Sequence, residues 1–186
     1  AVILAAGKGT RMTSCKPKAL QTLAGRPLVE HILVKLADVA IDEVVIIHSP
    51  EAKKDFEKKI GTNKKITYVE QEQALGTAHA LKTALPHVTS DNLLVLLGDV
   101  PLLSRRTIKK IQKQTLDNDL VVLTGEVKNP FGYGRIVKDI EGKPMAIIEE
   151  LDCDEAQREI KEINSGIMAF KTNIAKNLVE RIKPSL

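Results

Sequence analysis

Short aliphatic runs alternate with stretches of helical periodicity along most of this 186-residue chain, and this alternation constrains its fold more than any other feature. The runs are Val2–Leu4, Val44–Ile47, Ile66–Val69, Leu93–Leu97 and Leu120–Leu123. They are continuous rather than alternating in polarity, which is typical of strands buried on both faces of a sheet. Strands that alternate with helices are joined by crossover connections, which give parallel neighbours. The sequence therefore predicts an α/β fold in three layers with a mostly parallel central sheet.

Apolar spacing places helices between these strands. Pro27 suits the first position of a helix, because its fixed φ matches helical geometry and its missing N–H is not needed there. Further helices are expected over Glu51–Lys59, over Thr77–Leu85 and after Ser104, whose hydroxyl can cap a helix N-terminus.

The pattern changes after about residue 128. The elements expected there are a loop over 129–134, a hairpin of Arg135–Lys138 with Met145–Ile148, a strand over Ile163–Phe170, and a helix capped by Thr172 with Ile174, Leu178 and Ile182 on one face. We therefore divide the domain into a first half, residues 1–128, and a second half, residues 129–186.

Composition narrows the class of partner. Three Phe, two Tyr and no Trp argue against a nucleic-acid surface built on base stacking. The net charge of +4 suits an anionic small molecule as well as a polyanion. Cys15 and Cys153 lie far apart without CxxC spacing, so neither a disulfide framework nor a zinc site is indicated and a reducing cytoplasm is expected. The apolar runs are far shorter than the ~20 residues that cross a bilayer, so we expect no membrane partner.

A glycine-containing segment, Ala5–Met12, directly follows the first strand. Loops at the carboxyl ends of strands are where open α/β sheets bind ligands. Gly7 and Gly9 would let the backbone approach a phosphate, and Lys8 and Arg11 would add positive charge there. Met12 stands at the third glycine position of GxGxxG, which disfavours a dinucleotide fingerprint. A phosphate-binding loop and a tight structural turn both remain open from this pattern.

Two charged residues complete the candidate site. Lys18 follows Pro17, which favours an extended stretch rather than a helix at this point. The apolar run Leu93–Leu97 is followed by Gly98 and then by Asp99, so the Asp99 carboxylate is expected at the ligand-binding edge of the sheet. A carboxylate there can bind Mg²⁺ together with substrate phosphates and water. It can equally bond the amides of a turn before Pro101.

Together these segments resemble the sugar-nucleotide pyrophosphorylases, and among them the uridylyltransferase domains that act on N-acetylglucosamine 1-phosphate. The motifs that carry the resemblance cover almost the whole chain: Leu4–Met12, Pro17-Lys18, Gln71 with Leu75–Ala80, Gly98–Leu102, Gly132–Ile136, Glu149, and Glu162–Gly166. The resemblance implies a Rossmann-like, three-layer nucleotide-diphospho-sugar transferase fold. Three positions differ from the pattern that many members share, namely Ala74, Leu97 and Leu151.

The resemblance also implies roles for individual residues. The implied nucleotide-binding residues are Leu4, Ala5, Ala6, Gly7, Gln71, Gly76, Thr77, Leu97 and Gly98. Arg11 and Lys18 would hold the triphosphate as catalytic residues, and Asp99 would bind Mg²⁺. Gly134, Glu149 and Asn164 would contact N-acetylglucosamine, so the first half would be nucleotide-binding and the second sugar-binding. His79, inside a motif, is interpreted as a packing residue or as a residue that supports a ligand contact.

The implied reaction is transfer of a uridylyl group from UTP to N-acetylglucosamine 1-phosphate, with release of pyrophosphate. It needs no strong base, because a phosphate monoester with a second pKa of about 6 is already mostly ionised at pH 7. The site must instead supply positioning and positive charge. The product would serve synthesis of peptidoglycan and lipopolysaccharide precursors in the cytoplasm.

Alternatives remain from the sequence alone. The chain could transfer another nucleotide to another sugar phosphate, or bind a sugar nucleotide without catalysis, although the latter does not require Arg11, Lys18 and Asp99 together. In the family a later asparagine also binds the metal, and a carboxy-terminal acetyltransferase domain supports oligomers. We therefore expect the domain to be incomplete at its C-terminal end.

Overall fold

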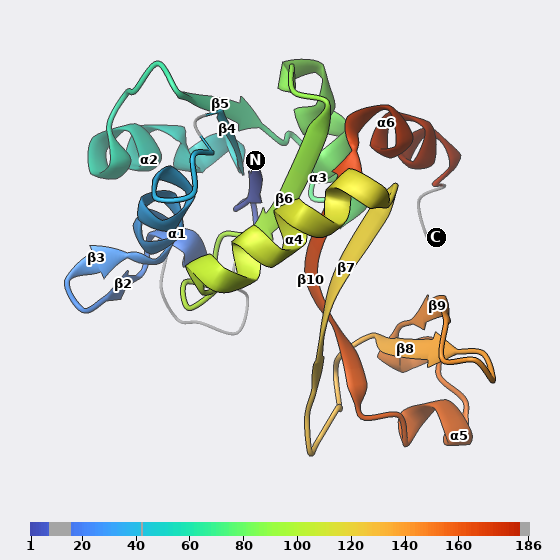
Figure 1. Cartoon of the computed structure of the whole chain (residues 1–186). Coiled ribbons are helices and arrows are strands. Elements are labelled where there is room, and N and C mark those ends of the chain that lie inside the picture. The colour runs from blue at the N-terminus through green and yellow to red at the C-terminus, as the bar shows by residue number, and fades with distance from the viewer. Residues whose placement is uncertain (8–15, 42, 183–186) are drawn as a thin grey trace. The chain divides into compact units, whose positions relative to one another are not determined.

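The computed structural model describes residues 1–7, 16–41 and 43–182, and within it the chain forms two compact units (Figure 1). Unit 1 comprises residues 1–121 and 169–186, and unit 2 comprises residues 122–168. Residues 169–186, which we assigned to the second half of the domain, thus group with the first part of the chain in space. The functional division into a nucleotide half and a sugar half stays a prediction.

The sheet of unit 1 is built around strand β1 (Val2–Leu4), which lies between β4 (Val44–His48) and β6 (Asn92–Leu97). Both neighbours are parallel to β1, and Ile3 lies opposite Ile46 and Leu96. Strand β5 (Ile66–Glu70) pairs in parallel with β4 on the outer side. The predicted mostly parallel α/β sheet is therefore confirmed.

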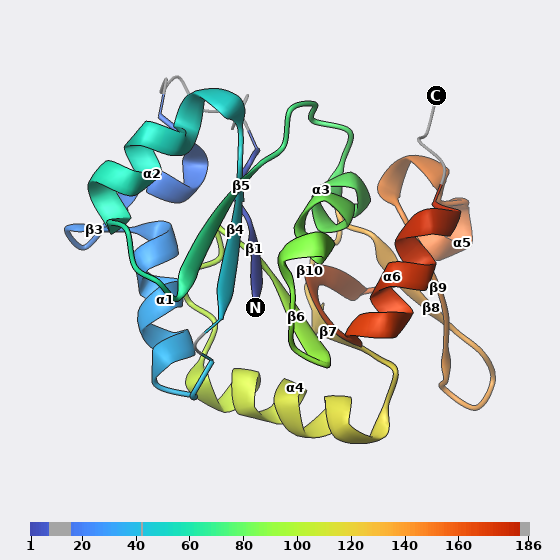
Figure 2. The same cartoon turned by 90° about the horizontal axis from the view of Figure 1, so that it is seen from above.

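Helices cover both faces of this sheet (Figure 2). Helices α1 (Leu28–Ala37) and α2 (Lys53–Ile60) lie on one side, and α3 (Thr77–Ala84) and α6 (Thr172–Arg181) lie on the other. Helix α4 (Arg105–Asp117) runs across the end of the sheet at which β1 begins. The described residues also form four short 3₁₀ helices: η1 (Lys18–Leu20), η2 (Pro50–Ala52), η3 (Leu85–His87) and, in unit 2, η4 (Glu150–Asp152).

Two of the predicted helix starts are wrong. Pro27 is extended, pairing with Thr22 in a small ribbon of β2 (Thr22–Leu23) and β3 (Arg26–Pro27), so α1 begins one residue later. Thr172 is the first residue of α6 rather than its cap, and its hydroxyl donates to the Ser90 carbonyl at 2.7 Å. The Ser104 cap is confirmed, since its Oγ accepts from the Thr107 N–H at 3.0 Å.

The buried face of α6 also differs from the predicted one. Ala175 and Val179 are buried, whereas Leu178 is 38% exposed and Ile182 is 55% exposed. A helix can present apolar residues on two faces, and periodicity alone does not say which face meets the sheet. Strand β7 (Leu120–Glu126) is likewise only partly buried, not buried on both faces as its continuous apolar run suggested.

Unit 2 is a small antiparallel assembly. Strands β8 (Arg135–Lys138) and β9 (Pro144–Ile148) form the predicted hairpin, with Arg135 opposite Ile148. Strand β10 (Glu162–Lys171) pairs with β8 and with β7, and its last residues run into unit 1. Helix α5 (Glu155–Arg158) connects the hairpin to β10 and begins with a capping box formed by Asp154 and Gln157.

Candidate functional site

The predicted nucleotide-binding backbone lies where β1 ends beside β4 and β6. The Gly98 N–H donates to the Leu4 carbonyl at 2.9 Å, and the Ala5 N–H donates to the Ile47 carbonyl at 2.8 Å. The Leu4 carbonyl and the Ala5 N–H are therefore occupied by hydrogen bonds within the sheet. Ala6 and Gly7 follow the last ladder pair of β1, and the position of a Cβ on Gly7 is open space. Within the described residues, Ala6 and Gly7 are thus the part of the segment that a ligand could approach.

Arg11 lies outside the described residues, as do Lys8, Gly9 and Met12 of the same sequence segment.

Gly98 fixes how closely η1 approaches the sheet. A Cβ at Gly98 would lie 3.0 Å from the Cβ atoms of Ala19 and Ala5 and 3.2 Å from the Leu4 carbonyl oxygen. Such distances are too short for ordinary van der Waals contact, so only glycine fits without displacement of its neighbours. Ala19 is buried within η1, which begins with Lys18. Ala19 could not be predicted as part of the site, because a lone alanine in a short turn carries no signal of its own.

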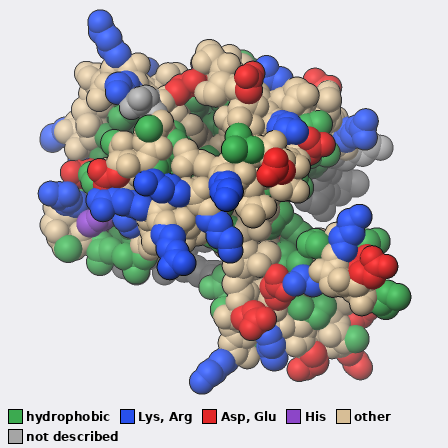
Figure 3. Space-filling view, in the orientation of Figure 1, with side chains coloured by type: hydrophobic (Ala, Val, Ile, Leu, Met, Phe, Trp, Pro, Cys, Tyr) green, Lys and Arg blue, Asp and Glu red, His purple; other side chains and the backbone are tan. Residues whose placement is uncertain are grey.

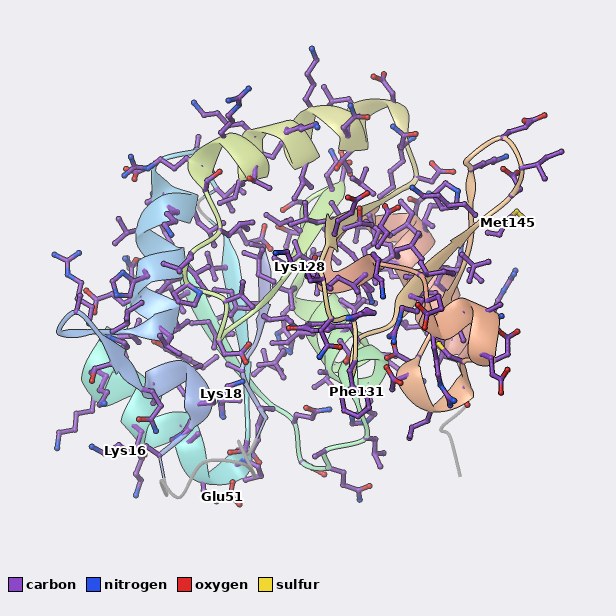
Figure 4. The ribbon with its side chains drawn as sticks, turned by 90° about the horizontal axis from the view of Figure 1, so that it is seen from below. Lys16, Lys18, Glu51, Lys128, Phe131 and Met145 are labelled. Carbon is purple, nitrogen blue, oxygen red and sulfur yellow. The ribbon has the colours of Figure 1, made fainter. Side chains whose placement is uncertain are left out.

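Lys18 and Asp99 are brought together at this edge. The Lys18 Nζ forms an ion pair with Asp99 Oδ2, and the side chains are 47% and 28% exposed. The turn after β6 closes through the Val100 N–H and the Leu97 carbonyl at 3.2 Å. The backbone thus completes this turn, and the Asp99 carboxylate faces Lys18. Figure 4 shows Lys18 on the edge of the sheet where β4 leads into η2, which carries Glu51.

Asp99 is the metal-ligand candidate at this edge. Over residues 1–7, 16–41 and 43–182, no group of three or more His, Cys, Asp or Glu side chains could hold a metal ion. Mg²⁺, however, is commonly bound through one or two carboxylates, with substrate phosphates and water supplying the other ligands. A single, partly exposed carboxylate fits a cation of that kind, and Lys18 contacts its Oδ2 in this structure.

Gln71 is a buried carboxamide beside α3. Its backbone N–H donates to the His48 carbonyl at 2.8 Å, which places it directly after β5. Its side chain is 5% exposed, and its Nε2 lies 3.0 Å from His79 Nδ1 and 3.4 Å from the Gly76 carbonyl oxygen. The amide nitrogen is therefore occupied by the protein, which leaves the amide oxygen as the group that could meet a ligand. His79 therefore contacts the Gln71 side chain, and its support of a ligand contact stays a prediction.

Gly76 and Thr77 begin α3. Gly76 has a φ of +92°, a conformation that side chains rarely adopt, and it is the N-cap of the helix. Thr77 is its first residue and is exposed. The N–H groups of a first helical turn have no partner within the helix, so this end can approach a polar ligand.

The three predicted sugar-binding residues meet within unit 2. The Asn164 N–H donates to the Gly134 carbonyl at 2.8 Å. A Cβ at Gly134 would lie 3.0 Å from Glu149 Oε1, so Gly134 and Glu149 are in close contact. The Asn164 side chain accepts from the Gly166 N–H at 2.9 Å through Oδ1. Gly134, Glu149 and Asn164 thus form one cluster built from β8, the end of β9 and β10.

A positive patch lies away from this edge of unit 1. Lysine and arginine side chains gather over α4 in Figure 3, where Arg106, Lys109, Lys110 and Lys113 are exposed. Helix α4 runs across the opposite end of the sheet, where β1 begins. Among the described helices, none is both long and apolar enough to span a bilayer.

Comparison with known proteins yields a family and a fold. The MobA-like NTP transferase domain matches residues 1–161. The bifunctional protein GlmU of Francisella tularensis subsp. novicida (strain U112) is 44% identical over 182 residues, which are 98% of this chain and 40% of that protein. GlmU of F. tularensis subsp. holarctica (strain OSU18) is 43% identical over the same length. The chain therefore spans about 40% of the length of the curated relatives that it matches.

Solved structures share the fold at lower identity. A candidate glucose-1-phosphate thymidylyltransferase from Bacillus anthracis has a TM-score of 0.77 at 24% identity, covering 99% of this chain and 75% of that one. HddC from Yersinia pseudotuberculosis has a TM-score of 0.72 at 23% identity, covering 95% of this chain and 78% of that one. At these identities the similarity establishes the three-layer fold.

Proposed function

The chain belongs to the MobA-like NTP transferase domain family, and on that premise we propose that it transfers a uridylyl group from UTP to N-acetylglucosamine 1-phosphate. The products are UDP-N-acetylglucosamine and pyrophosphate. The observation that carries this proposal is the contact between Lys18 and Asp99 beside the open backbone of Ala6 and Gly7. A cation and a carboxylate at the carboxyl edge of a parallel sheet suit a triphosphate and its metal ion.

The choice of UTP and N-acetylglucosamine 1-phosphate rests on two supports. The motifs Gly76–Ala80, Gly132–Ile136 and Glu162–Gly166 resemble those of uridylyltransferases that use this sugar phosphate. The 44% identity to a GlmU protein over 98% of this chain agrees with that resemblance.

The reaction is a direct displacement at the α-phosphorus. A phosphate oxygen of N-acetylglucosamine 1-phosphate forms the new P–O bond, and the bond from the α-phosphorus to the oxygen that bridges it to the β-phosphate breaks. The electron pair leaves with pyrophosphate. Because the attacking phosphate is already mostly ionised at pH 7, no residue has to remove a proton. The site contributes positioning and stabilises the charge that develops on the leaving group.

Lys18 is the described residue that would meet that charge. Its ammonium group forms an ion pair with Asp99 in this structure. Because 47% of the Lys18 side chain is exposed, the side chain can turn towards a phosphate. Arg11 would act beside it. Mg²⁺ would be held by Asp99 together with substrate phosphates, and when bound it would neutralise phosphate charge.

The nucleotide and sugar ends are recognised by different residues in this proposal. The Gln71 amide oxygen would accept from the uracil N–H, with Ala6, Gly7, Gly76, Thr77, Leu97 and Gly98 lining the nucleotide. The cluster of Gly134, Glu149 and Asn164 would contact the N-acetylglucosamine hydroxyl and amide groups. Because the product is a building block of cell-wall polymers, we place the activity in the cytoplasm, in the supply of peptidoglycan and lipopolysaccharide precursors.

A substrate panel tests the proposal. The protein is incubated with Mg²⁺ and each combination of UTP, dTTP, CTP, GTP or ATP with N-acetylglucosamine 1-phosphate, glucose 1-phosphate or mannose 1-phosphate, and pyrophosphate release is measured. We expect UTP with N-acetylglucosamine 1-phosphate to give the highest kcat/KM by at least tenfold. A different preferred pair would reassign the substrates, and saturable binding of UDP-N-acetylglucosamine without turnover would replace the enzyme by a binding module.

A further inference from the structure

We infer that the buried Arg135 and its partner Glu150 form a clamp that positions the sugar-binding cluster of unit 2. Arg135 is the first residue of β8, and Glu150 begins η4. Neither residue was assigned a role from the sequence. The inference rests on the proposed function, because it concerns the cluster of Gly134, Glu149 and Asn164 as a sugar-phosphate site.

The clamp joins two loops that are distant in the sequence. Arg135 Nη2 donates to Glu150 Oε2 at 2.7 Å, and Arg135 Nη1 donates to the Tyr133 carbonyl. The Gly132 N–H donates to the same Glu150 oxygen at 2.9 Å. One carboxylate therefore holds both the guanidinium and the backbone of the loop over residues 129–134, in which Figure 4 marks Phe131.

The clamp contributes little net stability to the hairpin, because it buries a charged side chain. Arg135 is 1% exposed, and within the described residues its Nε has no hydrogen-bond partner. Removing a charge from water costs free energy, and the attraction within a single ion pair seldom outweighs that cost. Well-packed apolar residues often stabilise a fold equally well. The arrangement therefore indicates a requirement for geometry rather than for stability. The planar guanidinium can meet a carbonyl and a carboxylate at once in fixed directions, which an ammonium group cannot.

Each residue of the clamp adjoins a residue of the sugar-binding cluster. Arg135 follows Gly134, and Glu150 follows Glu149. Gly134 has no room for a side chain, because Glu149 Oε1 and Ile147 Cγ2 each lie 3.0 Å from the Cβ position. A displacement of Arg135 relative to Glu150 must therefore move Gly134 relative to Glu149, and an error of about 1 Å in a positioning group can cost roughly 100-fold in rate.

The charges agree with a clamp that is formed at neutral pH. The hydrogen bond from Arg135 lowers the pKa of Glu150 below its ordinary value, and the Gly132 N–H adds to the effect. Arg158 lies near the second oxygen, with its Nε 3.9 Å from Glu150 Oε1. Glu150 therefore stays ionised, and its partners stay attached.

The test compares Arg135→Lys and Glu150→Ala with the wild-type protein. The matched control is Lys138→Met, which breaks the more exposed ion pair between Lys138 and Glu162 in the same unit. We expect both clamp variants to raise KM for the preferred sugar 1-phosphate at least tenfold while KM for UTP changes less than twofold. The control should change neither value by more than twofold. Equal changes in both KM values, or none, would overturn the clamp as a positioning device.

Hydrogen exchange provides a readout that needs no substrate. We expect amide exchange over residues 129–134 and 149–152 to accelerate at least tenfold in Glu150→Ala and Arg135→Lys, and not in Lys138→Met. Unchanged exchange would overturn the clamp even if the wild-type protein turned over no substrate at all. A wild-type preference for another sugar phosphate would overturn the proposed substrate instead, and the KM comparison would then use that sugar. If Arg135→Lys fails to fold, Glu150→Ala carries the test alone, since the Glu150 side chain is 18% exposed.

Discussion

The Cβ atom of Ala19 lies 3.0 Å from the position that a side-chain carbon on Gly98 would occupy. This contact joins η1 to the end of β6, and the residues next to each partner are Lys18 and Asp99. The ion pair of the candidate site thus depends on close packing one residue away from it. Glycine is required at position 98 because the neighbouring atoms leave no room for a side chain. The backbone conformation does not require glycine, because the φ of Gly98 is in the ordinary range.

Gly98→Ala should damage the site through packing alone. The added methyl group must push Ala19 or Ala5 aside, and overpacking of this kind typically costs about 1–3 kcal/mol. We expect a lower thermal midpoint, by roughly 5 °C, and a fall in kcat of at least tenfold as Lys18 moves away from Asp99. Calorimetry and pyrophosphate release measure the two effects.

The control for this substitution is Gly125→Ala in β7, where no atom lies within 4 Å of the Cβ position. It should leave both the thermal midpoint and kcat nearly unchanged. Full activity in Gly98→Ala would contradict the argument that this glycine sets the position of η1.

Lys18→Ala should lower kcat more than it raises KM for UTP. The charge that Lys18 meets grows as pyrophosphate leaves, and one such contact is typically worth roughly 100-fold to 1,000-fold in rate. The matched control is Lys171→Met, since Lys171 pairs with Asp119 at 3.1 Å and its side chain is 40% exposed. A kcat for Lys18→Ala within a few-fold of the wild-type value, measured in single-turnover experiments, would remove Lys18 from the catalytic residues.

Much of the fold could be predicted from the sequence because the strands of unit 1 are short and continuously apolar. Val2–Leu4 was predicted without error, and the predicted Leu93–Leu97 differs from β6 by one residue. The predictions that were wrong concern residues whose local sequence fits more than one structure, so that tertiary contacts decide which structure forms. Pro27 joined a strand pair instead of a helix, and α6 buried Ala175 and Val179 rather than its larger apolar residues.

The candidate site was less predictable than the fold. Motif residues such as Gln71 and Asp99 could be identified, but their partners could not. The contact of Gln71 with His79 spans eight residues, and that of Arg135 with Glu150 spans fifteen. No periodicity links such pairs, because loop conformation brings them together. The close approach of Ala19 to Gly98 is equally invisible to sequence patterns.

His79→Ala should weaken the use of UTP and leave the sugar phosphate unaffected. The His79 ring lies 3.0 Å from the Gln71 amide nitrogen, and its loss would free the carboxamide to rotate away from the nucleotide. A net hydrogen bond of about 1 kcal/mol corresponds to roughly a fivefold rise in KM for UTP. The control is His87→Ala, because His87 is exposed in η3. Steady-state kinetics with each substrate varied in turn measure the difference, and a rise in KM for the sugar phosphate instead would refute the pairing.

Asn164→Ala should have the opposite selectivity. We expect KM for N-acetylglucosamine 1-phosphate to rise roughly 10-fold to 100-fold, the effect of an unsatisfied polar group, while binding of UTP stays nearly intact. Asn164→Asp keeps the oxygen that accepts from the Gly166 N–H and separates this local contact from ligand binding. Equal losses for both substrates, measured by calorimetry and kinetics, would end the assignment of Asn164 to the sugar.

The stability of unit 2 should fall in acid because two of its carboxylates are held in the ionised form. The hydrogen bond from Arg135 lowers the pKa of Glu150, and that from Lys138 lowers the pKa of Glu162, both below the ordinary value of 4.5. A group with a lowered pKa in the folded state stabilises the fold fully above its unfolded pKa, and this contribution is lost as the pH falls through the folded value. We therefore expect the stability that these two groups provide to be constant from pH 8 to about pH 5.5 and to decrease below about pH 4.5.

Thermal unfolding followed by circular dichroism between pH 3 and pH 8 measures this dependence of stability on pH. Glu150→Gln should be less stable than the wild-type protein at pH 7, and the difference should shrink as the pH falls below 4.5 towards the lowered folded-state pKa of Glu150. Glu159→Gln, which removes a carboxylate that is 83% exposed, serves as the control and should run parallel to the wild-type curve. A Glu150→Gln curve that stays parallel to the wild-type curve down to pH 3 would show that Glu150 titrates alike in the folded and unfolded chains.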